Sequence, residues 1–165
     1  MRKPYGHDDH AAELARLRAA IEAAGDVVYE WNLADDRVSW LGDASHVFAP
    51  PFKGPPSTGE ALARCVHPDD LGRRQKALSD HLRRGLAYDV EYRLRTADGC
   101  LHWVHDRGAV DAGHGGAVLK LSGTLRLITN RKEREARLEY LANFDELTGH
   151  YNKVRLRDDL DRTIA

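Results

Sequence analysis

The sequence is poor in the residues that build covalent and metal-bound centres. Among its 165 residues are two cysteines and one methionine. Cys65 and Cys100 stand in different segments, without the Cys-x-x-Cys spacing or the neighbouring ligands of a zinc site. We therefore expect both thiols to be reduced and structural.

Long apolar runs are missing as well. Charged residues such as Glu22 and Lys120 interrupt the longest apolar stretches, well short of the roughly 20 residues that cross a bilayer. Residues 1–10 also lack the apolar centre of a signal peptide. These absences predict a cytoplasmic protein with no membrane partner.

No charge of one sign dominates the composition. Lys and Arg number 25 against 26 Asp and Glu, and the formal net charge is -1. Because excess positive charge is needed to neutralise phosphates, nucleic acid is not an expected partner. The apolar fraction of 42% and the charged fraction of 31% are ordinary for a soluble protein, and the length suits one domain with a short extension.

The first periodic segment is an amphipathic helix. Residues 10–24 carry Leu14, Leu17 and Ile21 at spacings of three and four, and Gly25 is the expected stop. This apolar stripe lies outside the domain that follows, so we assign it to the interface of a homodimer.

Two groups of strands frame a helical stretch. Residues 27–32 and 38–41 are rich in β-branched and aromatic side chains around a polar turn, which predicts a hairpin. Residues 88–96, 100–110 and 118–128 predict three long antiparallel strands joined by glycine-containing turns. The order favours an α+β fold, with an antiparallel sheet covered on one face.

Between the two groups the sequence predicts two helices. Ser57 followed by Glu60 has capping-box spacing for a short helix. His67-Pro68-Asp69-Asp70 places a proline and two acids where a longer helix starts, and Gly85 is its capping candidate. The inward stripe of the longer helix comprises Leu71, Leu78 and Leu82.

A charged helix follows the last strand. Residues 130–143 combine strong helix formers with both signs of charge, which predicts a straight, solvated helix. Leu138 and Leu141 could continue a short coiled-coil seam, and we assign them to the dimer contact. A second helix is expected from Lys153.

Residues 26–132 resemble the PAS family, in particular its subgroup with an HPDD motif. The resemblance covers about two-thirds of the chain in the family's order, which makes it more specific than any single motif. The residues that carry it are Tyr29-Glu30-Trp31-Asn32-Leu33, Val38-Ser39-Trp40, His67-Pro68-Asp69-Asp70, Glu91-Tyr92-Arg93-Leu94, Asp98-Gly99, His102-Trp103-Val104, Gly123-Thr124 and Ile128-Thr129-Asn130-Arg131-Lys132.

The resemblance implies a PAS domain at residues 25–129, with a five-stranded antiparallel sheet, helices on one face, and flanking helices at 1–24 and 130–143. It implies a regulatory, non-catalytic role in which an internal cavity or the surface biases the exit helix. Leu127 stands where the family usually has an acid at this exit. The exit residues that we assign to signal transmission are Thr129, Asn130, Arg131 and Lys132.

Four aromatic residues could line an internal pocket, or could simply form the core. They are Trp31, Trp40, Tyr92 and Trp103. The sequence does not specify a ligand or a signal for such a pocket.

Residues 145–153 read Asp-Glu-Leu-Thr-Gly-His-Tyr-Asn-Lys and resemble the opening sequence of GGDEF domains. The resemblance implies that residues 144–165 are the truncated start of such a domain, without its catalytic loop. It also assigns signal transmission to Asp145, Leu147 and Thr148. The fragment is then no enzyme, whereas the whole protein is a diguanylate cyclase or a cyclic di-GMP phosphodiesterase.

Three positions depart from the usual GGDEF opening. His150, Tyr151 and Lys153 stand in place of Leu, Pro and Arg. A degenerate opening is compatible with a regulatory GGDEF domain that feeds a downstream EAL phosphodiesterase domain, as in a PdeA-like phosphodiesterase. Whether the protein makes or degrades cyclic di-GMP stays open.

Several residues could suggest a cofactor, and each has a simpler interpretation. Cys65 lies in Arg-Cys-Val-His, unlike the Asn-Cys-Arg-Phe-Leu-Gln motif of flavin-binding light sensors. His81 falls on the long helix where haem-binding PAS domains place a ligand, but beside the apolar stripe. His67, Asp69 and Asp70 fit a helix start better than a metal site. We expect no cofactor and no metal.

Two classes of function remain. In the first, the PAS domain senses a small molecule and controls GGDEF and EAL output through the exit helix. In the second, it is a ligand-free docking module that homodimerises and binds an adaptor protein, for instance one that controls regulated turnover.

Overall fold

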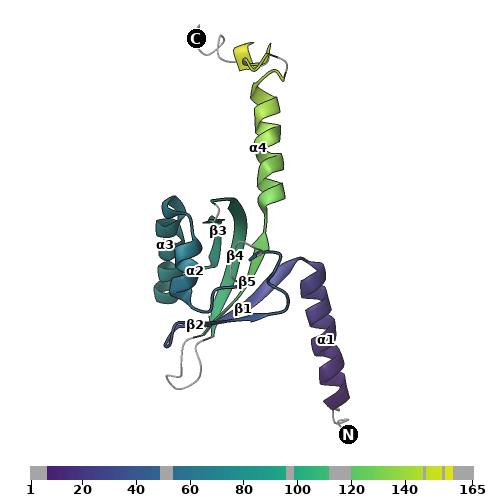
Figure 1. Ribbon diagram of the computed structural model, residues 1–165, viewed down its shortest axis with the longest axis vertical. Coiled ribbons are helices and arrows are strands. Elements are labelled where there is room, and N and C mark those ends of the chain that lie inside the picture. Colours follow the sequence, from purple (N-terminus) through teal and green to yellow (C-terminus); the bar gives the residue numbers. More distant parts are fainter. Residues whose placement is uncertain are drawn as a thin grey trace. The chain divides into compact units, whose positions relative to one another are not determined.

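The computed structural model describes residues 7–48, 54–95, 99–111, 120–146, 148–153 and 155–157 (Figure 1). The chain divides into two compact units, Met1–Leu127 and Ile128–Ala165. Within the described residues, no helix combines the length and the apolar character that crossing a membrane requires. The two units are described separately.

The first unit is built on a five-stranded antiparallel sheet. Its strands are β1 (Asp26–Asn32), β2 (Arg37–Leu41), β3 (Tyr88–Arg95), β4 (Leu101–Asp111) and β5 (Lys120–Leu127). Their order in the sheet is β2-β1-β5-β4-β3. The first strand in the sequence, β1, therefore pairs with the last, β5. The predicted hairpin and the three predicted long strands are confirmed.

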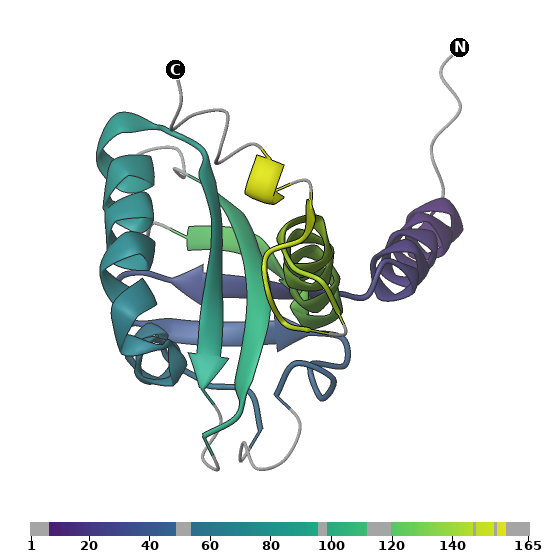
Figure 2. The same ribbon diagram turned by 90° about the horizontal axis from the view of Figure 1, so that it is seen from above.

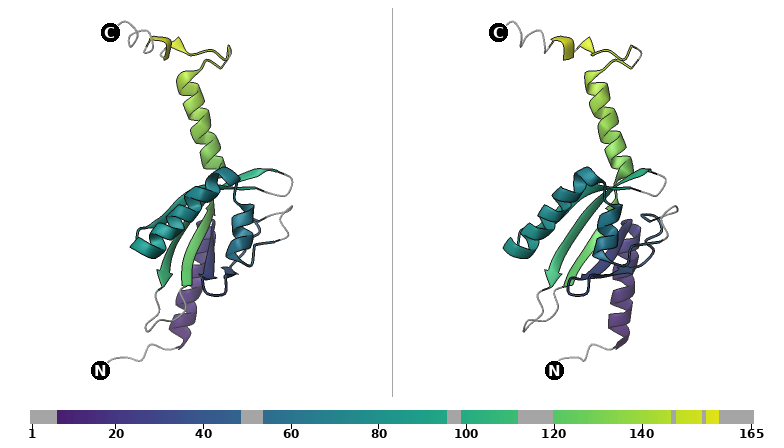
Figure 3. Two further views of the ribbon diagram at one scale, coloured as in Figure 1. Left: turned by 90° about the vertical axis from the view of Figure 1, so that its left-hand side faces the viewer. Right: turned by 60° about the vertical axis from the view of Figure 1, so that its left-hand side comes forward.

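Two helices, α2 (Gly59–Cys65) and α3 (Pro68–Arg84), lie over one face of this sheet (Figures 2 and 3). Along β3, successive side chains alternate between the helix-covered face and the opposite face. The inward side chains of β3 are buried, as their period of two predicts: Tyr88, Val90, Tyr92 and Leu94. Helix α1 (His7–Ala23) precedes β1, contacts it, and ends before Gly25 at φ 70. The α+β prediction, with a helix-covered antiparallel sheet, is confirmed.

The start of α2 corrects the expected capping box. Thr58, rather than Ser57, is the N-cap, and its side-chain oxygen accepts a hydrogen bond from the Ala61 N–H. Asp36, in the β1–β2 turn at φ 57, supplies the other acceptors: its carboxylate receives the N–H groups of Gly59 and Glu60. A residue distant in sequence therefore caps this helix, because the free N–H groups at a helix start need acceptors from any source.

Helix α3 begins and ends where the sequence predicts. His67 is the N-cap, Pro68 opens the first turn, and Gly85 closes the helix in the left-handed conformation. The expected stripe needs correction, because Leu82 is exposed at the end of the helix. Leu71 and Leu78 pack against the core, and the two fully buried residues of α3 are polar, Asp70 and Arg74.

Asp70 ties α3 to the edge strand β3. Its carboxylate accepts hydrogen bonds from the backbone N–H and the Nε of Arg93, at 3.0 and 2.7 Å. The Arg93 carbonyl in turn accepts the N–H of His67. The two acids of the HPDD motif thus have separate roles, since Asp69 stays exposed at the helix start while Asp70 is buried in an ion pair.

We expect this ion pair to stabilise the domain at neutral pH and to lose that effect in acid. Hydrogen bonds from Arg93 lower the pKa of Asp70, whereas an unfolded aspartate titrates near about 3.9. The stabilisation is therefore complete above that pH and disappears as the pH falls through the lowered folded-state pKa. In urea unfolding, Asp70→Asn should cost about 1.5–3 kcal/mol at neutral pH and far less in strong acid. An equal cost under both conditions would contradict this role.

The second unit contains α4 (Thr129–Asn143), which confirms the predicted charged helix. None of the residues that α4 comprises is buried. Residues 153 and 155–157 are helical, in agreement with the predicted start of a second helix. Leu147, assigned to signal transmission, lies outside the described residues, as do the expected continuation of that helix and the turns at 96–98 and 112–119.

Candidate functional site

The interior of the first unit holds a carboxylate surrounded by tyrosines. Asp106, on β4, is fully buried. Its Oδ1 accepts the hydroxyl of Tyr29, and its Oδ2 accepts the hydroxyls of Tyr88 and Tyr92, each at 2.8 Å. Tyrosines from two strands, β1 and β3, thus direct their hydroxyls at one acid on a third strand, β4. We call this group, together with Arg74, the interior polar cluster.

Arg74 brings the opposite charge from α3. Its Nε lies 3.8 Å from Asp106 Oδ2, and both side chains are buried. The guanidinium lies over two aromatic rings, 5.9 Å from the centre of Trp31 and 5.5 Å from that of Tyr92. Among the described residues, Nε has no hydrogen-bond acceptor. Attraction to Asp106 and to the ring faces therefore holds the cation in place.

The electrostatics keep the tyrosines as donors. Burial, followed by the charge of Asp106, raises the pKa of Tyr29 and Tyr92 far above the ordinary value, and the pKa of Tyr88 rises for the same reasons. All three phenols stay protonated at neutral pH. The cluster is therefore a charge pair whose carboxylate accepts all three phenol hydrogen bonds, and it links α3 to the sheet. It offers no ionised phenol for acid–base chemistry.

The tyrosine rings also fill the space above the sheet. A Cβ on Gly123 of β5 would lie 2.5 Å from the Tyr29 ring and 2.5 Å from the Arg107 carbonyl. A Cβ on Gly108 of β4 would lie 3.3 Å from the Tyr88 ring. Glycine is required at Gly123 because a ring packs directly on the backbone there.

The predicted pocket aromatics occupy different surroundings. Tyr92 belongs to the interior polar cluster, and Trp31 covers Arg74 while its indole N–H donates to Asp36. Trp40 packs against Tyr29 and Phe48 and donates to the Pro56 carbonyl. Trp103 is on the opposite face of the sheet, under the Arg93 guanidinium. The structure thus brings Trp31 and Tyr92 together and separates Trp103 from them.

The residues considered for cofactors have protein partners. Cys65 is half-buried on α2 and its Sγ donates to the Ala61 carbonyl, whereas Cys100 is exposed. His81 Nε2 accepts the Val110 N–H, and Nδ1 lies beside the Leu86 carbonyl. His67 Nδ1 accepts the Asp69 N–H. Within the part of the chain that the structure describes, no group of three metal-ligating side chains occurs.

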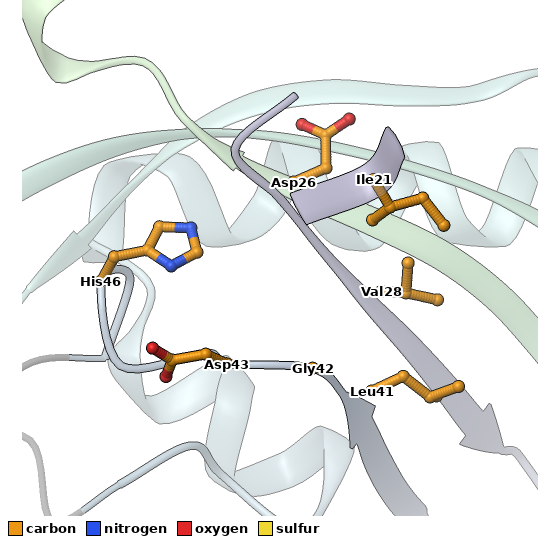
Figure 4. A pocket seen from close by; sticks show the side chains of 7 residues that line it. All are labelled: Ile21, Asp26, Val28, Leu41, Gly42, Asp43 and His46. Carbon is orange, nitrogen blue, oxygen red and sulfur yellow. The ribbon is translucent and has the colours of Figure 1, made fainter. Parts of the chain in front are cut away.

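A groove of about 560 Å³ lies at the junction of α1, β1 and the end of β2 (Figure 4). Ile21, Val28 and Leu41 form one side, and Asp43 and His46 stand opposite. Asp26, which also lines the groove, is paired with Arg126. None of the predicted pocket aromatics lines this groove.

The residues assigned to a dimer interface are mostly exposed. The exposed fractions of Leu14 and Leu17 are 58% and 55%, whereas Ile21 lines the groove. In the second unit, Leu138 and Leu141 are exposed at 66% and 38%. These leucines are available to a second chain, and the dimer stays a prediction.

The residues assigned to signal transmission lie at the two ends of α4. At its start, Arg131 pairs with Glu135, and Lys132 approaches the same carboxylate. Thr129 opens the helix and Asn130 is exposed. Beyond its end, the Asp145 carboxylate accepts both the N–H and the hydroxyl of Thr148, which closes a turn.

Asp106 and Arg74, the charged centre of the interior polar cluster, were not predicted as site residues. Asp106 is two residues from buried Val104 on β4, and therefore shares its inward face. Arg74 is three residues after Leu71 and four before Leu78, on the inward side of α3. The period of two along β4 and the helical period along α3 put Asp106 and Arg74 on the inward faces. This periodicity could have identified both as buried charged residues.

A family model described as the PAS fold matches residues 54–125. The uncharacterized protein y4lL of Sinorhizobium fredii is 36% identical over 92 residues, which are 52% of this chain. The match spans 11% of that relative's length.

Solved structures share the fold. A sensory box histidine kinase/response regulator from Burkholderia thailandensis is 25% identical, with a TM-score of 0.64 over 89% of this chain and 98% of the other. The N-terminal domain of a diguanylate cyclase with PAS/PAC sensor from Marinobacter aquaeolei is 19% identical, with a TM-score of 0.57 over 65% and 98%. The family match over residues 54–125 and the five-stranded architecture together show that the chain carries the PAS fold, which it shares with these domains of signalling proteins.

Proposed function

We propose that this PAS domain is the cytoplasmic regulatory input of a cyclic di-GMP signalling protein, and that it controls GGDEF or EAL output through α4. The observation that carries the proposal is continuity. β5 ends at Leu127, α4 begins at Thr129, and the turn after α4 has the GGDEF-like sequence 145–153. A change in the domain can bias the output if the output favours one arrangement of α4 over another.

The test changes the phase of α4 in the whole protein that carries this chain. Two residues inserted after Glu135 rotate everything beyond by about 200°, whereas seven residues restore the phase almost fully. We expect the two-residue insertion to change cyclic di-GMP synthesis or hydrolysis about fivefold or more, and the seven-residue insertion to change it little. The 165-residue chain alone should show no turnover.

Two results would contradict the proposal. The first is a whole protein with neither cyclase nor phosphodiesterase activity. The second is an unchanged rate after the two-residue insertion.

A second candidate is a ligand-free docking module that homodimerises and binds an adaptor protein. The interior polar cluster favours it, because Asp106 already accepts three tyrosine hydroxyls and pairs with the Arg74 cation inside the domain, where a ligand would sit. The exposed Leu14 and Leu17 favour it too, since a stripe outside the sheet gains most by burial against another chain. Mass spectrometry of denatured purified protein separates the candidates, because a co-purifying metabolite supports sensing.

A further inference from the structure

The segment that follows α4 folds back on the end of that helix. The Asp145 N–H donates to the His150 carbonyl at 2.8 Å, and the Gly149 N–H donates to the Asp145 carbonyl at 2.9 Å. Gly149 has φ 68, the left-handed conformation that glycine adopts without strain. Together with the Asp145–Thr148 bonds, these contacts tie Asp145 to Thr148, Gly149 and His150.

Asn152 joins the two helical segments across this turn. Its Nδ2 donates to the carbonyls of Leu141 and Ala142, at 3.2 and 2.9 Å, and its backbone N–H donates to the Asn143 carbonyl at 2.9 Å. These carbonyls belong to the last turn of α4, where intrahelical donors are missing. The same side chain's Oδ1 accepts the Arg155 N–H at 2.9 Å, which is the geometry of an N-cap.

A row of rings runs beside this connection. Tyr140 and Phe144 stack with centroids 5.0 Å apart, and Phe144 and Tyr151 follow at 5.1 Å. Arg137 lies over Tyr140 and Arg155 over Tyr151, at 5.8 and 5.7 Å from the ring centres. Phe144 and Tyr151 also form an antiparallel backbone bridge.

We propose that residues 140–146, 148–153 and 155 form a rigid joint and that Asn152 is its positioning residue. The amide side chain caps the end of α4 and the start of the next helical residues at once. A rotation or shift of α4 is therefore passed to the following segment rather than absorbed in a flexible linker. The relevance to signalling rests on the proposed function, whereas the rigidity of the joint does not.

Two substitutions separate the two halves of the cap. Asn152→Ala removes both. Asn152→Asp keeps an oxygen that can accept the Arg155 N–H, but it cannot donate to the carbonyls of Leu141 and Ala142. Lys153→Ala is the matched control, because Lys153 is exposed and adjacent.

The test measures amide hydrogen exchange by NMR and the distance between spin labels at positions 133 and 157. The labels are placed in a chain without Cys65 and Cys100 and diluted with unlabelled chain, so that only intrachain distances are recorded. The unsubstituted joint and Lys153→Ala should give one narrow distance distribution. Asn152→Ala should broaden it and speed exchange of the Arg155 amide about tenfold. Asn152→Asp should keep that amide protected while exchange at the end of α4 rises.

An unchanged distance distribution and unchanged exchange in Asn152→Ala would overturn the rigid joint. Equal protection of the Arg155 amide in the Ala and Asp variants would overturn the capping role of Asn152. Neither readout depends on nucleotide turnover, so a narrow distribution in a protein without cyclic di-GMP activity would refute the proposed function and support the joint.

Discussion

Asp106→Ala should destabilise the PAS domain by about 3–5 kcal/mol, because it leaves the buried Arg74 cation without its charged partner. The substitution removes the partner of Arg74 and the acceptor of three phenols, all within the core. Urea unfolding followed by tryptophan fluorescence measures the loss. A cost below about 1 kcal/mol, the size of an ordinary single hydrogen bond, would show that the interior polar cluster does not stabilise the fold.

The controls separate charge from hydrogen bonding. Asp106→Asn keeps the size and one carbonyl oxygen, so its cost should be smaller than that of the alanine variant. Arg74→Met should also cost less, because Asp106 retains its three phenol donors. The double variant Arg74→Met with Asp106→Ala should cost less than the sum of its single changes, since no unpaired cation remains.

Leu17→Asp should convert the proposed homodimer into a folded monomer. Burying Leu17 contributes about 1.5–3 kcal/mol in each copy, so its loss from both should weaken dimerisation at least about a hundredfold. Light scattering gives the mass, and circular dichroism checks the fold. Ala19→Asp is the control, because Ala19 lies on the opposite side of α1, is exposed, and receives the same charge.

Two outcomes would count against α1 as the interface. One is a Leu17→Asp variant that stays dimeric. The other is a variant that unfolds, which would mean that the stripe packs on its own domain. An Ala19→Asp variant as disrupted as Leu17→Asp would show an effect of charge rather than of a contact.

The sheet and its helices could be predicted from local patterns. Each strand has one face in the core, so a period of two identified the inward residues of β3, such as Tyr92 and Leu94. Pro68 and Gly85 act through backbone geometry at the ends of α3, and both boundaries were therefore visible in the sequence. The match of the whole motif order to the PAS family then fixed the topology, which alternation alone leaves open.

The candidate site could not be predicted in the same way, because its contacts join distant segments. Asp36 caps helix α2, which starts 23 positions later in the chain, and Asp70 on α3 pairs with Arg93 on β3. Asp106 is one residue from exposed Arg107, and only its place in the sheet makes it a buried anion. Asn152, likewise, belongs to a motif whose letters do not reveal that its side chain serves two helical segments.

The order of strands in the sheet has a consequence for biosynthesis. β5 lies between β1 and β4, and its pairing with β1 brings Asp26 to Arg126 across a separation of 100 positions. Until β5 has left the ribosome, the edges of β1 and β4 that will pair with it stay unpaired in the nascent chain. Such long-range pairing slows folding, and exposed edges invite association with other chains. A ribosome that stalls before residue 120 should yield an aggregation-prone product, while release beyond residue 127 lets the sheet close in a single cooperative step.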